Sequence, residues 1–284
     1  MASTDESVYK GNCHCGSYRF EFHLREHIKP VKCDCLLCRK QGYLWQFLLQ
    51  ASIVVSRDDG HMVQYNSAEL QHQVGLSQLN LLRLAHIPKF CSKCGSGVLG
   101  EHLVGPLKGE KLVNLRMLRG LDLFKLEVEG QDTSTSVGQL ALNTCGACYC
   151  GRVKVEITAP LLDLKLKEDN CSICTRNAWA GVYATTAQVK LAGMENVTEY
   201  QFGRKFMGHP FCITCGVHVY MNVYGPPKSV VDRLPEERKE MIRKNLDLKP
   251  VNIRVLEGVE LEHLNIERSE EGTDGYEQDV LGLS

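Results

Sequence analysis

The cysteines of this chain restrict its fold more than any other feature, because their spacing repeats. The chain has 14 cysteines, and 13 of them fall into short clusters that occur in the same order in each half. The clusters of the first half are Cys13 and Cys15, then Cys33, Cys35 and Cys38, then Cys91 and Cys94. Those of the second half are Cys148 and Cys150, then Cys171 and Cys174, then Cys212 and Cys215. The layout predicts two copies of one cysteine-organised domain.

Metal binding explains these cysteines better than disulfides do. Each half holds an odd number of them, and the C-x-C and C-x-x-C spacings are those of metal ligands in intracellular chains. The first residues show neither the basic region nor the apolar run of a secretory signal. We therefore expect a cytoplasmic protein with reduced thiols.

Composition and charge exclude several classes of partner. The 284 residues are 43% hydrophobic and 24% charged, which is ordinary for globular domains and is enough chain for two of them. A net charge of −1 gives no general attraction to nucleic acid or to anionic lipid. No apolar run is long enough to span a membrane. We expect neither kind of partner, and the oligomeric state is left open.

Two further segments repeat and are typical of β-strands. CHCGSYRFEF at 13–22 matches CYCGRVKVEI at 148–157, and VNLRMLRGLD at 113–122 matches VNIRVLEGVE at 251–260. Aromatic and polar residues alternate over 18–22, as in a half-buried strand, and 43–49, 53–56 and 112–118 are further strand candidates. The chain is therefore expected to be mainly β.

The same comparison predicts the domain boundaries. The first domain spans 10–130, a polar linker spans 131–143, the second domain spans 144–266, and an acidic tail spans 267–284. The second domain carries an insertion, 226–250, which contains a short helical pattern that begins near a proline and ends in basic residues. This insertion is either a lid over a pocket or a surface connection.

Two sets of four cysteines predict closed zinc sites. Two distant cysteine pairs can complete a tetrahedral site that leaves no open position, which is typical of structural zinc. One set is Cys13, Cys15, Cys91 and Cys94; the other is Cys148, Cys150, Cys212 and Cys215.

The middle cluster of the first copy has only three thiolates, from Cys33, Cys35 and Cys38. Three protein ligands and an open position are typical of a catalytic zinc, and three sulfurs favour binding of an incoming thiol over activation of water. Alternatively, His86 or Asp34 supplies a fourth ligand and closes the site.

The second copy has Asp169 where the first has Cys33. A zinc site on Asp169, Cys171 and Cys174 therefore either survives with altered chemistry or is vestigial. Cys145 either contributes to this site or remains a separate thiol. Two to four zinc ions per chain are expected in all.

These motifs resemble those of the glutathione-dependent formaldehyde-activating enzyme (centromere protein V-like) family. The resemblance rests on the three cysteine clusters, on the glycines that follow Cys15 and Cys94, and on the Val-Asn-x-Arg segments, and it covers nearly the whole chain. It implies two antiparallel β domains of the β-tent type. It also implies carbon–sulfur lyase or synthase chemistry on glutathione or its S-adducts, with the reactive zinc on Cys33, Cys35 and Cys38.

Substrate contacts are predicted beside that cluster. Tyr43 and Trp45 either line an apolar pocket or belong to the core. Arg39 and Lys40 either anchor glutathione carboxylates or are solvated surface charges. A small thiol or thiol adduct is the expected partner; the alternative function is a non-catalytic, zinc-stabilised scaffold for a protein.

Overall fold

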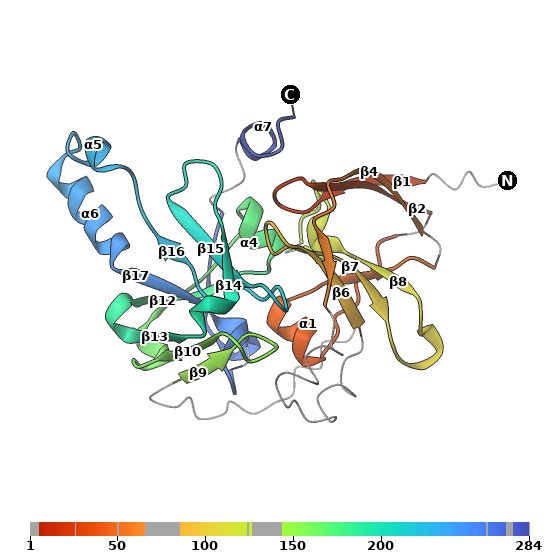
Figure 1. The fold of residues 1–284 in the computed structure, drawn as a ribbon, viewed down its shortest axis with the longest axis horizontal. Coiled ribbons are helices and arrows are strands. Elements are labelled where there is room, and N and C mark those ends of the chain that lie inside the picture. The colour runs from red at the N-terminus through yellow and green to blue at the C-terminus, as the bar shows by residue number, and fades with distance from the viewer. Residues whose placement is uncertain are drawn as a thin grey trace. The chain divides into compact units, whose positions relative to one another are not determined.

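The computed structural model describes residues 6–25, 27–49, 51–65, 86–123, 125–126, 144–259, 261–270 and 275–283. It divides into two compact units (Figure 1). Unit 1 comprises Met1–Ser134, Ser172–Ala178 and Thr214–Gly216, and unit 2 the remaining residues. The predicted linker, 131–143, lies outside the described residues. The domain boundaries therefore stay a prediction.

Unit 1 contains two antiparallel sheets. The first has the order β1-β2-β4, with β1 at Ser7–Asn12, β2 at Tyr18–Leu24 and β4 at Ala51–Asp58. In β2, buried and partly exposed residues alternate along the whole strand, as the sequence pattern predicts. The first strand begins three residues before the predicted start of the domain, because Ser7 pairs with Leu24.

The second sheet of unit 1 has the order β3-β8-β7-β6-β5. Its strands are β3 (Trp45–Phe47), β5 (Met62–Gln64), β6 (His86–Cys91), β7 (Gly97–His102) and β8 (Lys111–Asn114). The helix α1, Leu36–Gln41, precedes β3 and ends at Gly42, whose left-handed backbone stops the helix. The short 3₁₀ turn η1 spans Gly105–Leu107.

Unit 2 contains three sheets. Their orders are β13-β10-β9, β17-β12-β11-β18 and β14-β15-β16. The strands are β9 (Thr144–Ala147), β10 (Lys154–Ile157), β11 (Lys165–Asp169), β12 (Ala180–Thr185), β13 (Val189–Ala192), β14 (Val197–Tyr200), β15 (Met207–Cys212), β16 (Asn222–Val223), β17 (Leu248–Asn252) and β18 (Glu267–Ser269). All pairings are antiparallel except that of β11 with β18. The predicted mainly β class is confirmed for the described part of the chain.

The repeated Val-Asn-x-Arg segments are shorter as strands than predicted. β8 ends at Asn114 and β17 at Asn252, and each is followed by a 3₁₀ turn, η2 at Leu115–Met117 and η6 at Ile253–Val255. In both copies the asparagine side chain accepts a hydrogen bond from the backbone N–H two residues later. This local bond competes with continuation of the strand.

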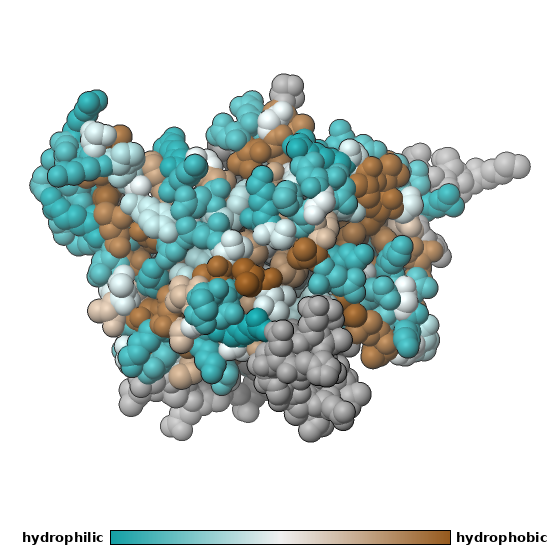
Figure 2. Space-filling model, in the orientation of Figure 1, coloured by the Kyte–Doolittle hydropathy of each residue, from teal (hydrophilic) through white to brown (hydrophobic). Residues whose placement is uncertain are grey.

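The helices of the second half are short. They are α4 (Ser172–Arg176), α5 (Lys228–Val231), α6 (Glu236–Leu246) and α7 (Tyr276–Asp279). The 3₁₀ turns are η3 (Leu161–Asp163), η4 (Thr186–Gln188), η5 (Met194–Asn196) and η7 (Leu261–His263). The predicted helix in the insertion is α6, which starts after Pro235 and has no buried residue. Figure 2 shows a mainly hydrophilic surface there. Both predicted roles of the insertion, a surface connection and a lid, stay predictions.

The region predicted as an acidic tail contributes two elements to unit 2. β18 extends the sheet beside β11, and α7 buries Tyr276. Among the described residues, no helix has the length and apolar character needed to cross a membrane.

Candidate metal centres

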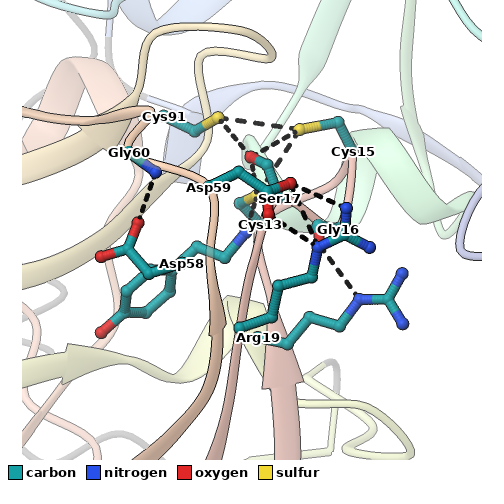
Figure 3. A network of polar contacts seen from close by, with 11 residues as sticks. Cys13, Cys15, Gly16, Ser17, Arg19, Asp58, Asp59, Gly60 and Cys91 are labelled. Carbon is teal, nitrogen blue, oxygen red and sulfur yellow. Dashed lines mark hydrogen bonds and ion pairs between the residues drawn. The ribbon is translucent and has the colours of Figure 1, made fainter.

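The four cysteines of the first predicted closed site meet where two strands end. We call this set (Cys13, Cys15, Cys91, Cys94) the Cys13 centre; its sulfurs lie within 4.8 Å of one another. Cys15 Sγ lies 3.6 Å from Cys13 Sγ and 3.7 Å from Cys91 Sγ (Figure 3). The Ser17 hydroxyl lies 3.1 Å from Cys15 Sγ, and the Tyr18 N–H donates to Cys13 Sγ. These polar hydrogens stabilise sulfur in its thiolate form.

Tight glycine turns bring these cysteines together. β1 ends just before Cys13, and the Gly16 N–H then donates to the Cys13 carbonyl at 2.9 Å. The Gly95 N–H donates to the Cys91 carbonyl at 2.8 Å at the end of β6. Both glycines have positive φ, which explains the Cys-Gly pairs in the sequence.

The equivalent set of the second copy forms a second cluster. We call it the Cys148 centre: Cys148, Cys150, Cys212 and Cys215. All four are buried, and Cys150 Sγ lies 3.5 Å from both Cys148 Sγ and Cys212 Sγ. The described residues, which include all 14 cysteines, contain no disulfide. Both groups of four that the spacing predicted are therefore assembled.

The middle cluster of the first copy gains a histidine. Cys33, Cys35, Cys38 and His86 place their ligand atoms within 4.8 Å of one another, and we call them the Cys33 centre. Cys35 is the residue before α1 and Cys38 lies in its first turn, whereas His86 opens β6. The other candidate, Asp34, is exposed and does not belong to the group. The chain thus offers three sulfurs and one ring nitrogen.

Hydrogen bonds among the thiols polarise the Cys33 centre. Those from Cys33 and Cys38 hold the pKa of the Cys35 thiol far below its usual value, and the bond with Cys35 raises the pKa of Cys33 to about 11. His86 Nδ1 is buried and has no hydrogen-bond partner. Clustered thiols beside an unpartnered imidazole nitrogen fit a soft cation such as zinc.

Aromatic residues enclose one side of this centre. The Trp45 indole N–H donates to Cys38 Sγ at 3.3 Å, and the Trp45 ring has no exposed surface. Tyr43, Trp45, Cys38 and Leu112 form one buried cluster. Lys40 is buried and Arg39 is exposed. A substrate-binding role for Arg39, Lys40, Tyr43 and Trp45 stays a prediction.

The fourth group, which we call the Asp169 centre, has three members: Asp169, Cys171 and Cys174. The carboxylate of Asp169 is already engaged. Its Oδ1 accepts the Cys171 N–H at 2.6 Å, and its Oδ2 accepts the Ser269 hydroxyl and lies 3.5 Å from Lys167 Nζ. The remaining thiol, Cys145, is exposed on β9 and belongs to none of the four groups.

Sequence reasoning missed His102. His102 Nδ1 lies 3.0 Å from His86 Nε2, because β6 and β7 pair these two residues directly. Two histidines 16 positions apart carry no spacing signal, so only the strand register reveals the pair.

Comparisons with known proteins identify the family of the chain. The family model of the glutathione-dependent formaldehyde-activating enzyme matches residues 8–121 and again 143–234. A crystal structure of a Rhodobacter sphaeroides protein is 27% identical, covering 44% of this chain and 99% of that one, with a TM-score of 0.33. A search of curated proteins found no match. Since the two matched regions span most of its length, the chain belongs to the glutathione-dependent formaldehyde-activating enzyme family.

Proposed function

We propose that this protein is a zinc-dependent carbon–sulfur lyase or synthase that acts on glutathione or its S-adducts, and that the reaction takes place at the Cys33 centre. One observation supports this choice above others. Cys33 and Cys35 are both partly exposed, whereas all four sulfurs of the Cys148 centre and all but Cys15 of the Cys13 centre are buried. This partial exposure is what would let a small thiol reach the Cys33 centre.

The reaction is an addition in one direction and an elimination in the other. In the synthase direction the glutathione sulfur forms a bond to the formaldehyde carbon, and the thiol proton ends on the former carbonyl oxygen. In the lyase direction that carbon–sulfur bond breaks, and the hydroxyl proton returns to sulfur. No oxidant or reductant is consumed in either direction.

The residues of the centre would hold sulfur in its anionic form once a metal ion is bound. A zinc ion bound here would hold the glutathione sulfur as a thiolate at neutral pH. The Trp45 indole N–H donates to Cys38 Sγ and disperses part of the negative charge of three neighbouring thiolates. Arg39 and Lys40, in the last turn of α1, are the proposed partners of the glutathione carboxylates.

The second candidate is a non-catalytic scaffold, and His86 is the observation that favours it. With His86 the Cys33 centre has four protein donors, which is the composition of many structural zinc sites. A scaffold of this kind would retain its zinc in the presence of glutathione and would turn over no adduct.

Turnover separates the two candidates. The assay follows release of glutathione from a panel of S-adducts, and formation of S-(hydroxymethyl)glutathione from formaldehyde, with a protein-free blank. We expect activity in the native chain and in Cys145→Ser, a thiol outside the four groups, and a loss of at least about 100-fold in Cys35→Ser. Equal activity in native protein and Cys35→Ser would show that the reaction does not take place at the Cys33 centre. Rates no higher than the blank with every substrate would favour the scaffold.

A further inference from the structure

The imidazole of His86 is buried in unit 1 and contacts the rings of Trp45 and His102. Only 3% of the residue is exposed. The ring stacks on Trp45, with centroids 5.8 Å apart and planes at 17°, and meets His102 edge-on with centroids 4.7 Å apart. The same Trp45 donates its indole N–H to Cys38, so one side chain contacts both a sulfur and the histidine of the Cys33 centre.

The two ring nitrogens of His86 have different surroundings. Nε2 lies 3.0 Å from His102 Nδ1, which is hydrogen-bonding distance. Nδ1 is buried and forms no hydrogen bond of normal geometry, while the His86 ring interacts with the Cys35 thiol and helps to lower its pKa. A buried polar atom without a partner costs free energy, about 1–3 kcal/mol in proteins generally, unless something else binds it. The ring nitrogen that this histidine offers to a metal therefore has to be Nδ1.

These observations carry one conclusion, which rests on the proposed function only in that the Cys33 centre holds a metal ion; it is compatible with a reaction there because a zinc with four protein ligands can take a substrate thiol as a fifth. We propose that His86 is the fourth protein ligand of that centre, through Nδ1, and that His102 is the positioning residue that fixes the His86 ring and its tautomer. A neutral imidazole that binds a metal through Nδ1 carries its proton on Nε2. That proton is donated to His102 Nδ1, so His102 carries its own proton on Nε2.

The second copy has neither histidine. When the copies are aligned on Cys91 and Cys212, Met207 replaces His86 and Val223 replaces His102. Aligned on Cys38 and Cys174, Gly181 replaces Trp45. The fourth ligand, its positioning partner and the indole that contacts both are all specific to the first copy. The two copies therefore offer different ligand sets at their middle clusters.

Cobalt(II) provides the test, because its visible bands report the atoms that bind it. Full-length protein is stripped of metal and titrated with cobalt, and the difference between native protein and Cys35→Ser isolates the spectrum of the Cys33 centre. In His86→Ala we expect altered d–d bands and weaker binding. In His86→Cys we expect sulfur-to-cobalt charge transfer to rise by about one third, since four thiolates replace three.

The role of His102 is tested by affinity. In His102→Phe we expect zinc affinity at the centre to fall about 10–100-fold, the usual effect of removing the partner of a metal-bound histidine. His102→Gln, whose amide oxygen can accept the same hydrogen bond, should recover most of that loss. The exposed His27→Ala is the matched control and should equal native protein.

The outcomes test the roles of His86 and His102 separately from the proposed function. Cobalt bands that are the same in native protein, His86→Ala and His86→Cys would overturn the assignment of His86, whether or not the chain turns over an adduct. Equal losses in His102→Phe and His102→Gln would overturn the positioning role. No cobalt signal that depends on Cys35 would overturn this inference and the reactive centre of the proposed function together. If the cobalt spectra change as expected but the native protein turns over no adduct, only the proposed function is rejected.

Discussion

The Trp45 indole N–H donates to Cys38 Sγ at 3.3 Å, and this contact joins the buried cluster beside β3 and β8 to the Cys33 centre. The bond has a direct consequence for metal retention. Trp45→Phe keeps an aromatic ring but loses the N–H, so we expect zinc at this centre to be released to a chelator about 10–150-fold more readily, in line with about 1.5–3 kcal/mol for a hydrogen bond to a charged group.

Trp179→Phe is the matched control for that experiment. The Trp179 indole nitrogen is also buried, but it has no hydrogen-bond partner. Its removal should leave metal release unchanged. Equal release from both variants would mean that ring packing, and not the N–H, retains the metal.

Metal content is the second prediction. The Asp169 carboxylate is engaged by Cys171, Ser269 and Lys167, so we expect three zinc ions per chain and none at the Asp169 centre. Elemental analysis of native protein and single Cys→Ser variants measures this. Cys212→Ser should lose one zinc and Cys171→Ser none; a fourth zinc that depends on Cys171 would refute the prediction.

The capping asparagines give the third prediction. Asn114 is fully buried; its Oδ1 accepts from the Leu44 and Arg116 N–H groups, and its Nδ2 donates to the Gly97 carbonyl. Asn114→Ala leaves these groups unpaired, so we expect the free energy of unfolding to fall by about 2–4 kcal/mol. Urea denaturation of the zinc-loaded protein measures the loss.

Asn252 is the counterpart in the second copy, where it accepts from the Arg254 N–H and donates to the His218 carbonyl. Asn252→Ala should therefore cost a similar amount. A change below about 0.5 kcal/mol in either variant, the usual range of a neutral surface substitution, would contradict the structural role.

The fourth prediction concerns pH. Burial lowers the pKa of His209 to about 4. The unfolded chain, with a histidine pKa near 6.5, binds this proton more readily than the folded chain does, so stability is present above pH 6.5 and is lost as the pH falls toward 4. The whole contribution is about 3 kcal/mol.

His209→Phe provides the comparison, because phenylalanine can keep the ring stacked on Phe202 without titrating. Chemical denaturation at pH 7 and at pH 4.5 should show a smaller loss of stability in the variant than in native protein. Loss of zinc at low pH affects both proteins and cancels in the difference. Parallel losses would show that His209 does not titrate in this range.

The cysteine pattern predicted much of this molecule because metal clusters impose their spacing on the sequence. Both groups of four assemble as expected, and the strand alternation of β2 appears residue by residue in its burial. The family model matches both copies. The end of β8 at Asn114 was missed, since an apolar run does not show where a side chain caps the backbone.

Contacts that depend on strand register could not be predicted from the sequence. His86 was one of two candidate fourth ligands, and the pairing of β6 with β7 that adds His102 could not be read from spacing. The engagement of Asp169 by Ser269 joins residues 100 positions apart in a parallel pairing of β11 with β18. The region of Ser269 has the composition of an acidic tail, and composition gives no pairing partner.

The contacts of the Asp169 carboxylate distinguish the middle cluster of the second copy from that of the first. The Lys167 ammonium group lies 3.5 Å from the Asp169 carboxylate. The corresponding cluster of the first copy has three cysteines, whose thiolates would require a bound cation. In the second copy the positive charge belongs to the polypeptide itself. We therefore expect the middle of the second copy not to depend on metal supply, so that zinc starvation disables the Cys33 centre while the Asp169 centre keeps its shape.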